Sequence, residues 1–555
     1  MDNSEIADRL DAFAILLELA ESNPYTIRAY RRAAETIRAT PAPVADLVAS
    51  GRVRALRGVG PGIAARLSEL VATGEIAELA ELQRELAPDL VGLGRYLGLS
   101  AARSMQIART LGVHSAQELR DAAAGGRLRS VPGIGPKTEA RLVEALRQSP
   151  EPRTRQVLHL NRARDLVGVI AAALGGEVAG DPRRWRDVCE HLAVVCAGPT
   201  ADGDPTTDAA LDRFTALPQI VAVIARGSRR AVGVTVEGVP VELVVAEPAR
   251  FGTELIRATG SPAYVAALEP LPEGASEQDV YAMLNLPWCP PELRETPPAD
   301  PPPDLVELSQ IRGDLHCHTT WTDGRATVEE MGRAARGRGY DYLAICDHTP
   351  AVGAVHGLTA DEVRRQGEEI AQANVALAPF RVLRGIECDI LPDGRLDLPD
   401  DVLAELDWVQ ASVHAGQRTP RRELTKRVTA ALEHPAVSCL SHPTGRLIGR
   451  RPENALDLDV VFDLARARGI ALEVNGLPDR LDLSGEHVRA ALRAGIRIVC
   501  STDSHSVRGL ANMELAVGTA RRGGATTSDI VNTRTLEHIH GAAAPCGRQA
   551  TPGPL

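Results

Sequence analysis

The chain has 555 residues, which is too long for one hydrophobic core and predicts about three to four domains. Its formal net charge of −11 excludes a generally basic surface, although a few arginines and backbone amides can still bind phosphate locally. The nine cysteines include no Cys-x-x-Cys pair, and no stretch approaches the roughly twenty apolar residues of a membrane helix. The N-terminus also lacks a basic region followed by an apolar run. We therefore expect a cytoplasmic protein with reduced thiols and no membrane contact.

Residues 1–150 have apolar side chains at helical spacing, and we expect two helical domains over 1–85 and 86–150. Each contains a glycine-rich turn before an amphipathic helix, in LRGVGPGIAARLSEL from Leu56 and LRSVPGIGPKTEARLVEAL from Leu128. These segments resemble helix-hairpin-helix motifs. Such glycines allow a tight turn and leave free N–H groups at the start of a helix, where a DNA phosphate can bind. One copy alone could be an ordinary connection between helices, but two copies favour DNA binding. The expected contacts are Gly58, Gly60, Gly62, Gly133, Gly135 and Lys137.

From residue 151 the pattern changes to alternating strands and helices, which predicts a small α/β domain over 151–246. A further segment over 247–304 ends in PWCPPELRETPPADPPPD, from Pro287. This run is too rich in proline for a packed element and predicts an extended linker. Residues 541–555 have the composition of a disordered tail.

After the linker, over residues 305–540, one predicted strand after another ends in a residue that can bind a metal ion. The opening stretch is GDLHCHTTWTDG, where two histidines two apart on a strand face the same side. One His-x-His pair is common on ordinary strands, but chance placement at so many successive strand ends is not expected. In α/β barrels the chemistry collects at the C-terminal ends of parallel strands. The candidate ligands are His316, His318, Asp323, His348, Glu387, His414, His442, Asp503 and His505.

The segment from 306 to 540 resembles a polymerase-and-histidinol-phosphatase (PHP) domain in the motifs DLHCHTTWTDG, ICDHTP, GIECDI, SVHAG, SHPTGR, EVNG and STDSH. The resemblance implies a distorted seven-stranded (β/α) barrel with three divalent metal ions, which polarise a phosphate and activate water. Mn and Zn suit such ligands, with Fe as an alternative. The resemblance implies one ion among His316, His318, Glu387 and Asp503, a second among Glu387, His414 and His442, and a third among Asp323, His348 and His505. Arg446 and Arg450 are candidate catalytic phosphate clamps, with solvated surface arginine as the alternative.

The order of parts resembles bacterial family-X DNA polymerases nearly end to end, with a nucleotidyltransferase palm over 151–246 and a thumb-like segment after it. The family pattern AGSxRRxxExxGDxDxxV is matched by AGDPRRWRDVCEHLAVV from Ala179. The family hydroxyl is Asp181 here, Arg183 and Arg184 persist, and the two metal-binding aspartates align with His191 and Ala193. The third carboxylate aligns with Glu242. Because alanine binds no metal and one acid cannot hold two magnesium ions, we expect this polymerase site to be degenerate.

These observations predict a DNA-binding, metal-dependent phosphoesterase. The expected reaction is 3′–5′ exonuclease activity or DNA 3′-end processing in repair, on gapped or 3′-ended DNA, by a monomer. Three alternatives stay open: a small-molecule phosphatase of the histidinol-phosphate type, an active family-X polymerase, and a non-catalytic DNA-binding scaffold.

Overall fold

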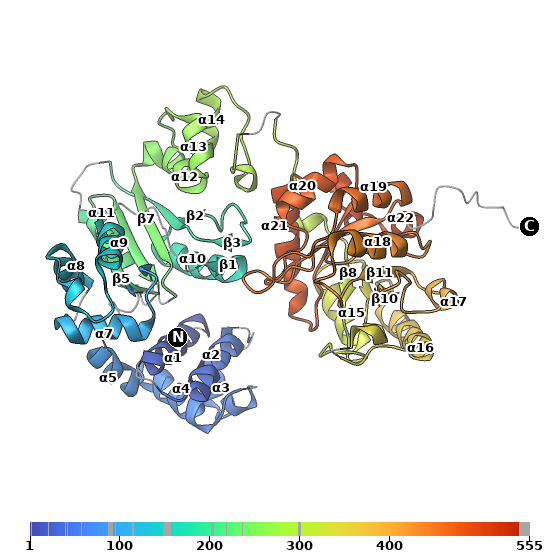
Figure 1. The fold of residues 1–555 in the computed structure, drawn as a ribbon, viewed down its shortest axis with the longest axis horizontal. Coiled ribbons are helices and arrows are strands. Elements are labelled where there is room, and N and C mark those ends of the chain that lie inside the picture. Colours follow the sequence, from blue (N-terminus) through green and yellow to red (C-terminus); the bar gives the residue numbers. More distant parts are fainter. Residues whose placement is uncertain are drawn as a thin grey trace, which may run out of the picture.

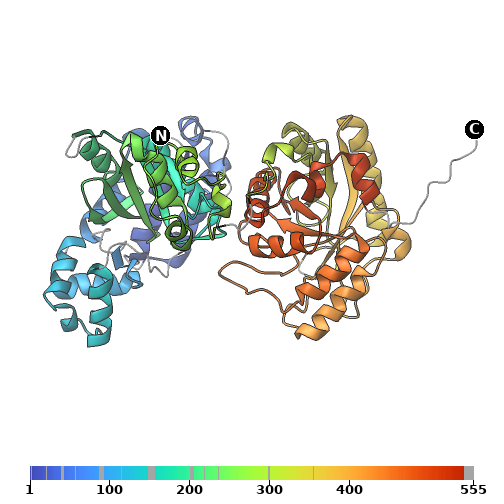
Figure 2. The ribbon, with the colours of Figure 1, turned by 90° about the horizontal axis from the view of Figure 1, so that it is seen from above.

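The computed structural model describes residues 1, 3–19, 22–38, 40, 43–56, 58–86, 93–94, 96–113, 116–147, 157–200, 205–217, 219–235, 237–297, 301–353 and 355–542. The predicted tail lies almost wholly outside these residues. Two masses lie side by side, one built from the N-terminal part of the chain and one from the C-terminal part (Figure 1 and Figure 2). The eight described cysteines are all buried and unpaired. Within these residues, none of the helices combines the length and the apolar character needed to cross a bilayer.

The N-terminal region is helical, as its apolar periodicity predicts, and has two separate cores. In the first core Phe13 and Tyr30 pack edge to face, with ring centroids 4.9 Å apart. Each glycine-rich turn lies between a short 3-10 helix and an α-helix that begins with proline, a residue suited to that position because it has no N–H to satisfy. The helices are α1 (Asn3–Leu19), α2 (Pro24–Arg38), α3 (Val44–Ala49), η1 (Val53–Ala55), α4 (Pro61–Thr73), α5 (Ala77–Leu86), α7 (Ala101–Leu111), α8 (Ala116–Ala124), η2 (Leu128–Ser130) and α9 (Pro136–Arg147).

The palm is a five-stranded sheet in the order β2-β4-β7-β6-β5, with a separate two-stranded pair of β1 and β3. Apolar residues of α10 and α11 pack against the sheet to form its core. The strands are β1 (Leu158–His159), β2 (Glu177–Gly180), β3 (Val188–Cys189), β4 (Leu192–Ala197), β5 (Ile220–Arg226), β6 (Arg230–Thr235) and β7 (Pro240–Ala246). The helices here and in the thumb-like segment are α10 (Leu160–Leu174), α11 (Pro205–Thr215), α12 (Phe251–Thr259), α13 (Pro262–Leu268) and α14 (Glu277–Met283).

The first part of the proline-rich run packs against the thumb-like segment, so the prediction of an extended linker is wrong for residues 287–297. Cys289 is 2% exposed, and Arg294 is fully buried. Arg294 Nη1 lies 2.5 Å from Glu277 Oε1 of α14, and its Nε donates to the Cys289 carbonyl at 2.9 Å. A buried guanidinium needs such a carboxylate partner. Proline content alone does not reveal a pairing with a distant glutamate.

The C-terminal part forms the predicted barrel of seven parallel strands, in the order β14-β13-β12-β11-β10-β9-β8. His318 N donates to the Ser504 carbonyl at 2.8 Å, which joins the chain after the first strand to the chain after the last. The strands are β8 (Gly313–Cys317), β9 (Tyr342–Ile345), β10 (Arg381–Asp389), β11 (Trp408–Ser412), β12 (Cys439–Leu440), β13 (Ala471–Asn475) and β14 (Ile498–Ser501). The surrounding helices are α15 (Val328–Gly337), α16 (Ala360–Leu377), α17 (Asp400–Leu403), α18 (Arg421–Leu432), α19 (Leu458–Arg468), α20 (Gly485–Arg493), α21 (Met513–Gly523) and α22 (Leu536–Ala542).

The barrel packs directly on the palm. Leu481 and Leu515 of the barrel belong to the same apolar cluster as Leu160 of the palm. Trp185 of the palm covers Gly518 on α21 so closely that an added Cβ would lie 2.1 Å from its ring. Figure 1 shows β1, β3 and α10 on the side of the palm nearest the barrel. The contact is therefore a packed interface.

Candidate metal centre

All nine predicted ligands lie at the C-terminal ends of the barrel strands or directly after them. Parallel strands that close into a barrel bring these ends together, which is why residues far apart in the sequence converge. His316 lies in β8 and Glu387 in β10, and the other ligands lie in the segments that follow β8, β9, β11, β12 and β14. The structure assembles three overlapping groups: His316, His318 and Asp503; His318, Asp323, His348 and His505; and His348, Glu387 and His414.

The first group lies deepest. His316 and His318 are fully buried, and their Nε2 atoms are 3.2 Å apart. Asp503 Oδ1 is 3.0 Å from His318 Nε2 and 3.8 Å from His316 Nε2. Glu387 Oε2 lies 3.5 Å from His316 Nε2. His316, His318 and Asp503 thus bring their ligand atoms together as a shared cation requires, and Glu387 lies beside this group.

The second group is centred on Asp323. Its Oδ2 lies 3.1 Å from His505 Nε2 and 3.7 Å from His348 Nε2. His318 Nδ1 is 3.8 Å from Asp323 Oδ1, so the two nitrogens of the His318 ring face two different groups. The residues implied for the third ion are therefore together, with His318 beside them.

The third group uses the other oxygen of Glu387. Its Oε1 is 2.8 Å from His442 Nε2 and 3.3 Å from His414 Nε2. Its Oε2 is 3.0 Å from His348 Nδ1. The set implied for the second ion thus surrounds one carboxylate oxygen, and His348 approaches from the opposite side. Glu387 is placed to bridge the groups.

The donor set fits divalent cations of the Zn, Mn or Fe type. His318 Nδ1 and His348 Nδ1 are buried, face carboxylate oxygens of these groups, and have no hydrogen-bond partner among the residues that the structure describes. A buried polar atom without a partner is costly, and a metal ion satisfies a neutral imidazole nitrogen. Ligand atoms about 3 Å apart also match metal bonds of about 2 Å.

The electrostatics keep His318 and two of the carboxylates in the forms that bind cations. Burial, together with the positive charges of His505 and His348, lowers the pKa of His318 to about 3, so its ring stays neutral. Burial alone would raise the pKa of Asp503, but His316 and His318 outweigh it and hold that pKa well below the usual range. Burial would also raise the pKa of Glu387, but His414 and His316 outweigh that effect and hold the pKa well below its usual range.

Two carboxylates that we did not select from the sequence orient the histidines. Glu473 Oε1 accepts from His316 Nδ1 at 2.7 Å, and its Oε2 accepts from the backbone N of His442 at 2.7 Å. Asp389 Oδ2 accepts from His414 Nδ1 at 3.1 Å. Such partners fix the orientation and the protonated nitrogen of a ligating imidazole. Strand alternation could have identified Asp389 from the sequence, because Asp389 lies two residues after Glu387 on β10 and its side chain faces the same side.

The two candidate clamping arginines differ in their surroundings. Arg446 Nη1 lies 2.9 Å from Asp187 Oδ2 of the palm. Its Nε and Nη2 donate to the carbonyls of Arg480 and Leu481 at 2.9 and 2.5 Å. Arg450 is exposed in the same loop. Arg446 therefore has protein partners on each side of its guanidinium.

Of the three aligned acid positions in the palm, only Glu242 is a carboxylate, and Arg230 and His191 contact its two oxygens. Glu242 Oε1 lies 3.0 Å from Arg230 Nη1, and Oε2 lies 3.5 Å from His191 Nε2. Ala193 is fully buried beside Glu242 in the sheet. Asp181 accepts from the backbone N of Glu190 and of His191 at 2.8 and 2.9 Å, so it supports a turn.

The two palm arginines that persist also have protein partners. Arg183 Nη1 lies 2.7 Å from Glu277 Oε1. Arg184 pairs with Asp181, and its Nε lies 3.1 Å from Glu295 Oε1. Both arginines thus tie the palm to the segment that follows it.

The hairpin glycines leave open space at the starts of α4 and α9. A Cβ added at Gly60, Gly62 or Gly135 would meet no atom within 4 Å. Gly58 and Gly133 have φ angles of 86° and 79°, which the tight turn requires. Lys137 is exposed in the first turn of α9. The backbone of these turns is open to an approaching phosphate.

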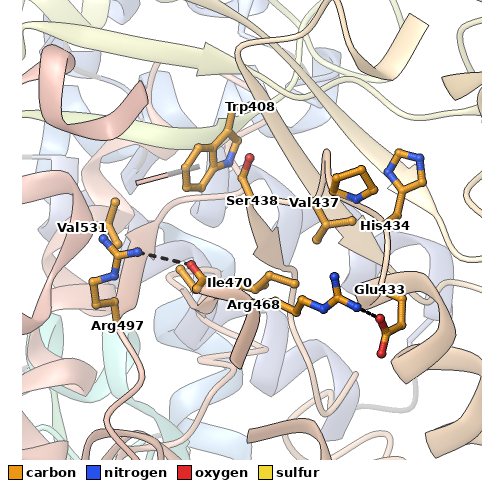
Figure 3. Close-up of a pocket in the computed structure, with 12 residues that line it drawn as sticks. Trp408, Glu433, His434, Val437, Ser438, Arg468, Ile470, Arg497 and Val531 are labelled. Atoms are coloured by element: carbon orange, nitrogen blue, oxygen red, sulfur yellow. Dashed lines mark hydrogen bonds and ion pairs between the residues drawn. The ribbon is translucent and has the colours of Figure 1, made fainter. Parts of the chain in front are cut away.

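A separate cavity of about 100 Å³ lies at the opposite end of the barrel (Figure 3). Trp408 is the first residue of β11, Ser438 directly precedes β12, and Arg497 directly precedes β14. This cavity is therefore at the N-terminal ends of the strands, away from the metal ligands.

Three family models match parts of the chain. A helix-hairpin-helix domain matches residues 1–76, and a SAM-like helix-hairpin-helix tandem matches residues 97–148. A PHP domain matches residues 314–476, which include seven of the nine predicted ligands. These matches agree with the hairpin motifs and with the barrel.

Whole proteins are also similar. The DNA polymerase/3′-5′ exonuclease PolX of Bacillus subtilis (strain 168) is 32% identical over 573 residues, which cover 97% of this chain and 99% of that protein. A probable phosphatase of Acetivibrio thermocellus is 32% identical over 203 residues, covering 35% of this chain and 78% of that protein. A probable phosphatase of Thermoanaerobacter sp. (strain X514) is 27% identical over 233 residues, covering 40% of this chain and 89% of that protein.

Proposed function

Because this chain belongs to the bacterial family-X DNA polymerases that carry a C-terminal PHP domain, we propose that it removes nucleotides from DNA 3′ ends at its barrel. The Bacillus relative is named a polymerase and a 3′-5′ exonuclease. The observation that best supports the nuclease half is the buried group of His316, His318 and Asp503, with Glu387 Oε2 3.5 Å from His316 Nε2. Processing of 3′-blocked ends at the same centre is a variant of this reaction.

The barrel residues would hold three divalent ions, Mn or Zn with Fe as an alternative, in the three groups described above. When bound, such ions neutralise phosphate charge and make water a stronger nucleophile. Glu387 would bridge, because its two oxygens face different sets of histidines. Glu473 holds the Nδ1 proton of His316, so that His316 Nε2 is free to bind a cation.

We further propose that the palm no longer adds nucleotides. Polymerisation needs several carboxylates around two magnesium ions. Glu242 is the one acid left of the aligned set, and Arg230 Nη1 pairs with it at 3.0 Å. The hairpin turns before α4 and α9 would bind gapped or 3′-ended DNA through its backbone phosphates.

The full-length protein with Mn²⁺ and a 3′-labelled oligonucleotide tests the nuclease. Mononucleotides should be released by the natural protein, and release should be undetectable after His316→Ala combined with His318→Ala. His538→Ala, at an exposed histidine on α22, is the matched control and should keep full activity. If the double variant released mononucleotides at the rate of the natural protein, the proposed metal site would be wrong.

A second candidate function is hydrolysis of small phosphomonoesters, which the two relatives named as probable phosphatases favour. The comparison of kcat/KM for p-nitrophenyl phosphate and for single-stranded DNA on one preparation separates the two. A higher value for DNA supports the nuclease, and turnover of the phosphomonoester alone supports the phosphatase.

A further inference from the structure

The loop after β13 places an arginine at the edge of the metal centre. Arg480 lies in this loop, and its Nε is 3.9 Å from Asp503 Oδ2, too far for a hydrogen bond. Its Nη1 is buried and has no hydrogen-bond partner within the described chain. A buried guanidinium N–H without an acceptor costs free energy. The atom therefore marks a place for an anionic oxygen beside Asp503.

A phosphate suits this place, because the substrate proposed for the neighbouring centre carries one. The planar guanidinium presents its N–H groups as a fork, which matches two oxygens of one phosphate. Asp503 Oδ1 already lies 3.0 Å from His318 Nε2 and 3.8 Å from His316 Nε2. Arg480 is thus within reach of any phosphate that binds at the same centre.

The backbone around Arg480 is fixed from one side by Arg446. This arginine donates to the Arg480 carbonyl at 2.9 Å and to the Leu481 carbonyl at 2.5 Å. Leu481 has a left-handed φ of 43° and is fully buried. A leucine keeps this conformation only where its surroundings enforce it. The two hydrogen bonds and the apolar cluster around Leu481 supply that constraint.

Arg446 in turn depends on the palm. Its Nη1 lies 2.9 Å from Oδ2 of Asp187, the residue before β3. Burial would raise the pKa of Asp187, but Arg446 and Arg522 outweigh it and lower that pKa, so the carboxylate stays charged. The contacts form a continuous path from Asp187 through Arg446 to the loop that carries Arg480. Figure 1 shows β3 of the palm at the side facing the barrel.

We propose that Arg480 binds a phosphate of the substrate and that Asp187 and Arg446 are positioning residues that hold it there. The inference rests on the proposed function, because the substrate is taken to be a DNA phosphate bound at the barrel centre. It assigns the palm a part in the barrel reaction, although the palm has lost two of its own three acids.

The test uses full-length protein loaded with Mn²⁺, 3′-ended single-stranded DNA, and the product dTMP as a binding probe. Arg480→Gln should lower kcat/KM about 100-fold, the usual loss when a donor to reacting oxygens is removed. It should weaken dTMP binding about 10-fold or more, as expected for a charge-assisted hydrogen bond. Arg480→Lys should restore part of both losses. The Mn²⁺ content should not change.

The positioning role has its own signature. Asp187→Asn should lower kcat/KM about 10-fold in the natural background and have no effect when Arg480 is already Gln, because residues that act through one group are not additive. Arg446→Lys keeps the charge beside Asp187 but cannot reach both carbonyls, and it should reproduce the Asp187→Asn result. Glu514→Gln removes another palm-to-barrel ion pair, at 2.9 Å from Arg164, and Arg466→Gln removes an exposed arginine. Both controls should behave as the natural protein.

Additive losses for Asp187→Asn and Arg480→Gln would overturn the positioning role. Unchanged dTMP binding by Arg480→Gln, or a lower Mn²⁺ content, would overturn the phosphate contact. If the natural protein degrades no DNA, the proposed function fails by itself. The same binding experiment with dTMP and inorganic phosphate then still decides the role of Arg480.

Discussion

Ala193 on β4 is the in-register neighbour of Glu242 on β7. One position has a carboxylate and the other has a methyl group, on adjacent parallel strands of the palm sheet. Arg230 and His191 contact the remaining acid at 3.0 and 3.5 Å. Burial would raise the pKa of Glu242, but His191 and Arg230 outweigh it and lower that pKa. The palm thus has an internal ion pair where the family places its metal-binding acids.

We expect no primer extension with four deoxynucleotides and either Mg²⁺ or Mn²⁺, because a single neutralised acid cannot hold two ions. Gel analysis of a gapped primer-template measures this, with the Bacillus relative as the positive control. Glu242→Gln should leave nuclease activity unchanged. Efficient extension that Glu242→Gln abolishes would show that the palm is active.

Glu473→Gln should weaken metal binding about 10- to 100-fold, the usual effect of losing a carboxylate that orients a ligating histidine. Glu473 contacts His316 and the backbone of His442, so one change disturbs two groups of ligands. Mn²⁺ titration of the metal-free protein measures the affinity. Glu368→Gln, at an exposed position on α16, is the control. Equal affinities for the two variants would contradict the orienting role.

Gly60→Asp should weaken DNA binding without loss of stability. Gly60 caps α4 with a φ of −78°, and an added side chain meets no atom within 4 Å. Aspartate is a good helix cap, so the fold should keep its stability, but its charge repels a phosphate at the same N–H groups. Fluorescence anisotropy with gapped DNA over a salt series should show weaker binding and a salt slope smaller by about 1. Gly60→Ala adds the Cβ without the charge. An equal loss of DNA affinity in this variant would show that the altered turn, and not repulsion of a phosphate, weakens binding.

Glu277→Gln should destabilise the palm and thumb-like segment. Burial would raise the pKa of Glu277, but Arg294 and Arg183 outweigh it and lower the pKa to about 2. Because the folded pKa is below the ordinary value, the charged form stabilises the fold above about pH 4.5, and this contribution is lost as the pH falls towards 2. Urea unfolding should show a loss of about 3 kcal/mol at pH 7 and a smaller difference at pH 3. Glu273→Gln, at an exposed glutamate, should match the natural protein at both pH values.

Local sequence patterns were sufficient to predict the barrel and the position of its nine candidate ligands at or after the strand ends. His316 and His318 share a face because strand side chains alternate, and barrel closure brings the strand ends together. The alignment of His191 and Ala193 with the metal-binding aspartates of the family could be made because the palm motif is contiguous. Ion pairs between residues far apart in the chain could not be predicted from the sequence. Arg446 with Asp187, and Arg294 with Glu277, join segments whose proximity no local pattern encodes.

Leu481 and Leu515 share one apolar cluster with Leu160 of the palm. Substitutions such as those at His191 and Ala193 leave this cluster intact, whereas deletion of the palm would expose it to water. The free-energy cost of that exposure grows with the apolar area uncovered. The palm therefore stabilises the barrel through an interface that includes neither His191 nor Ala193.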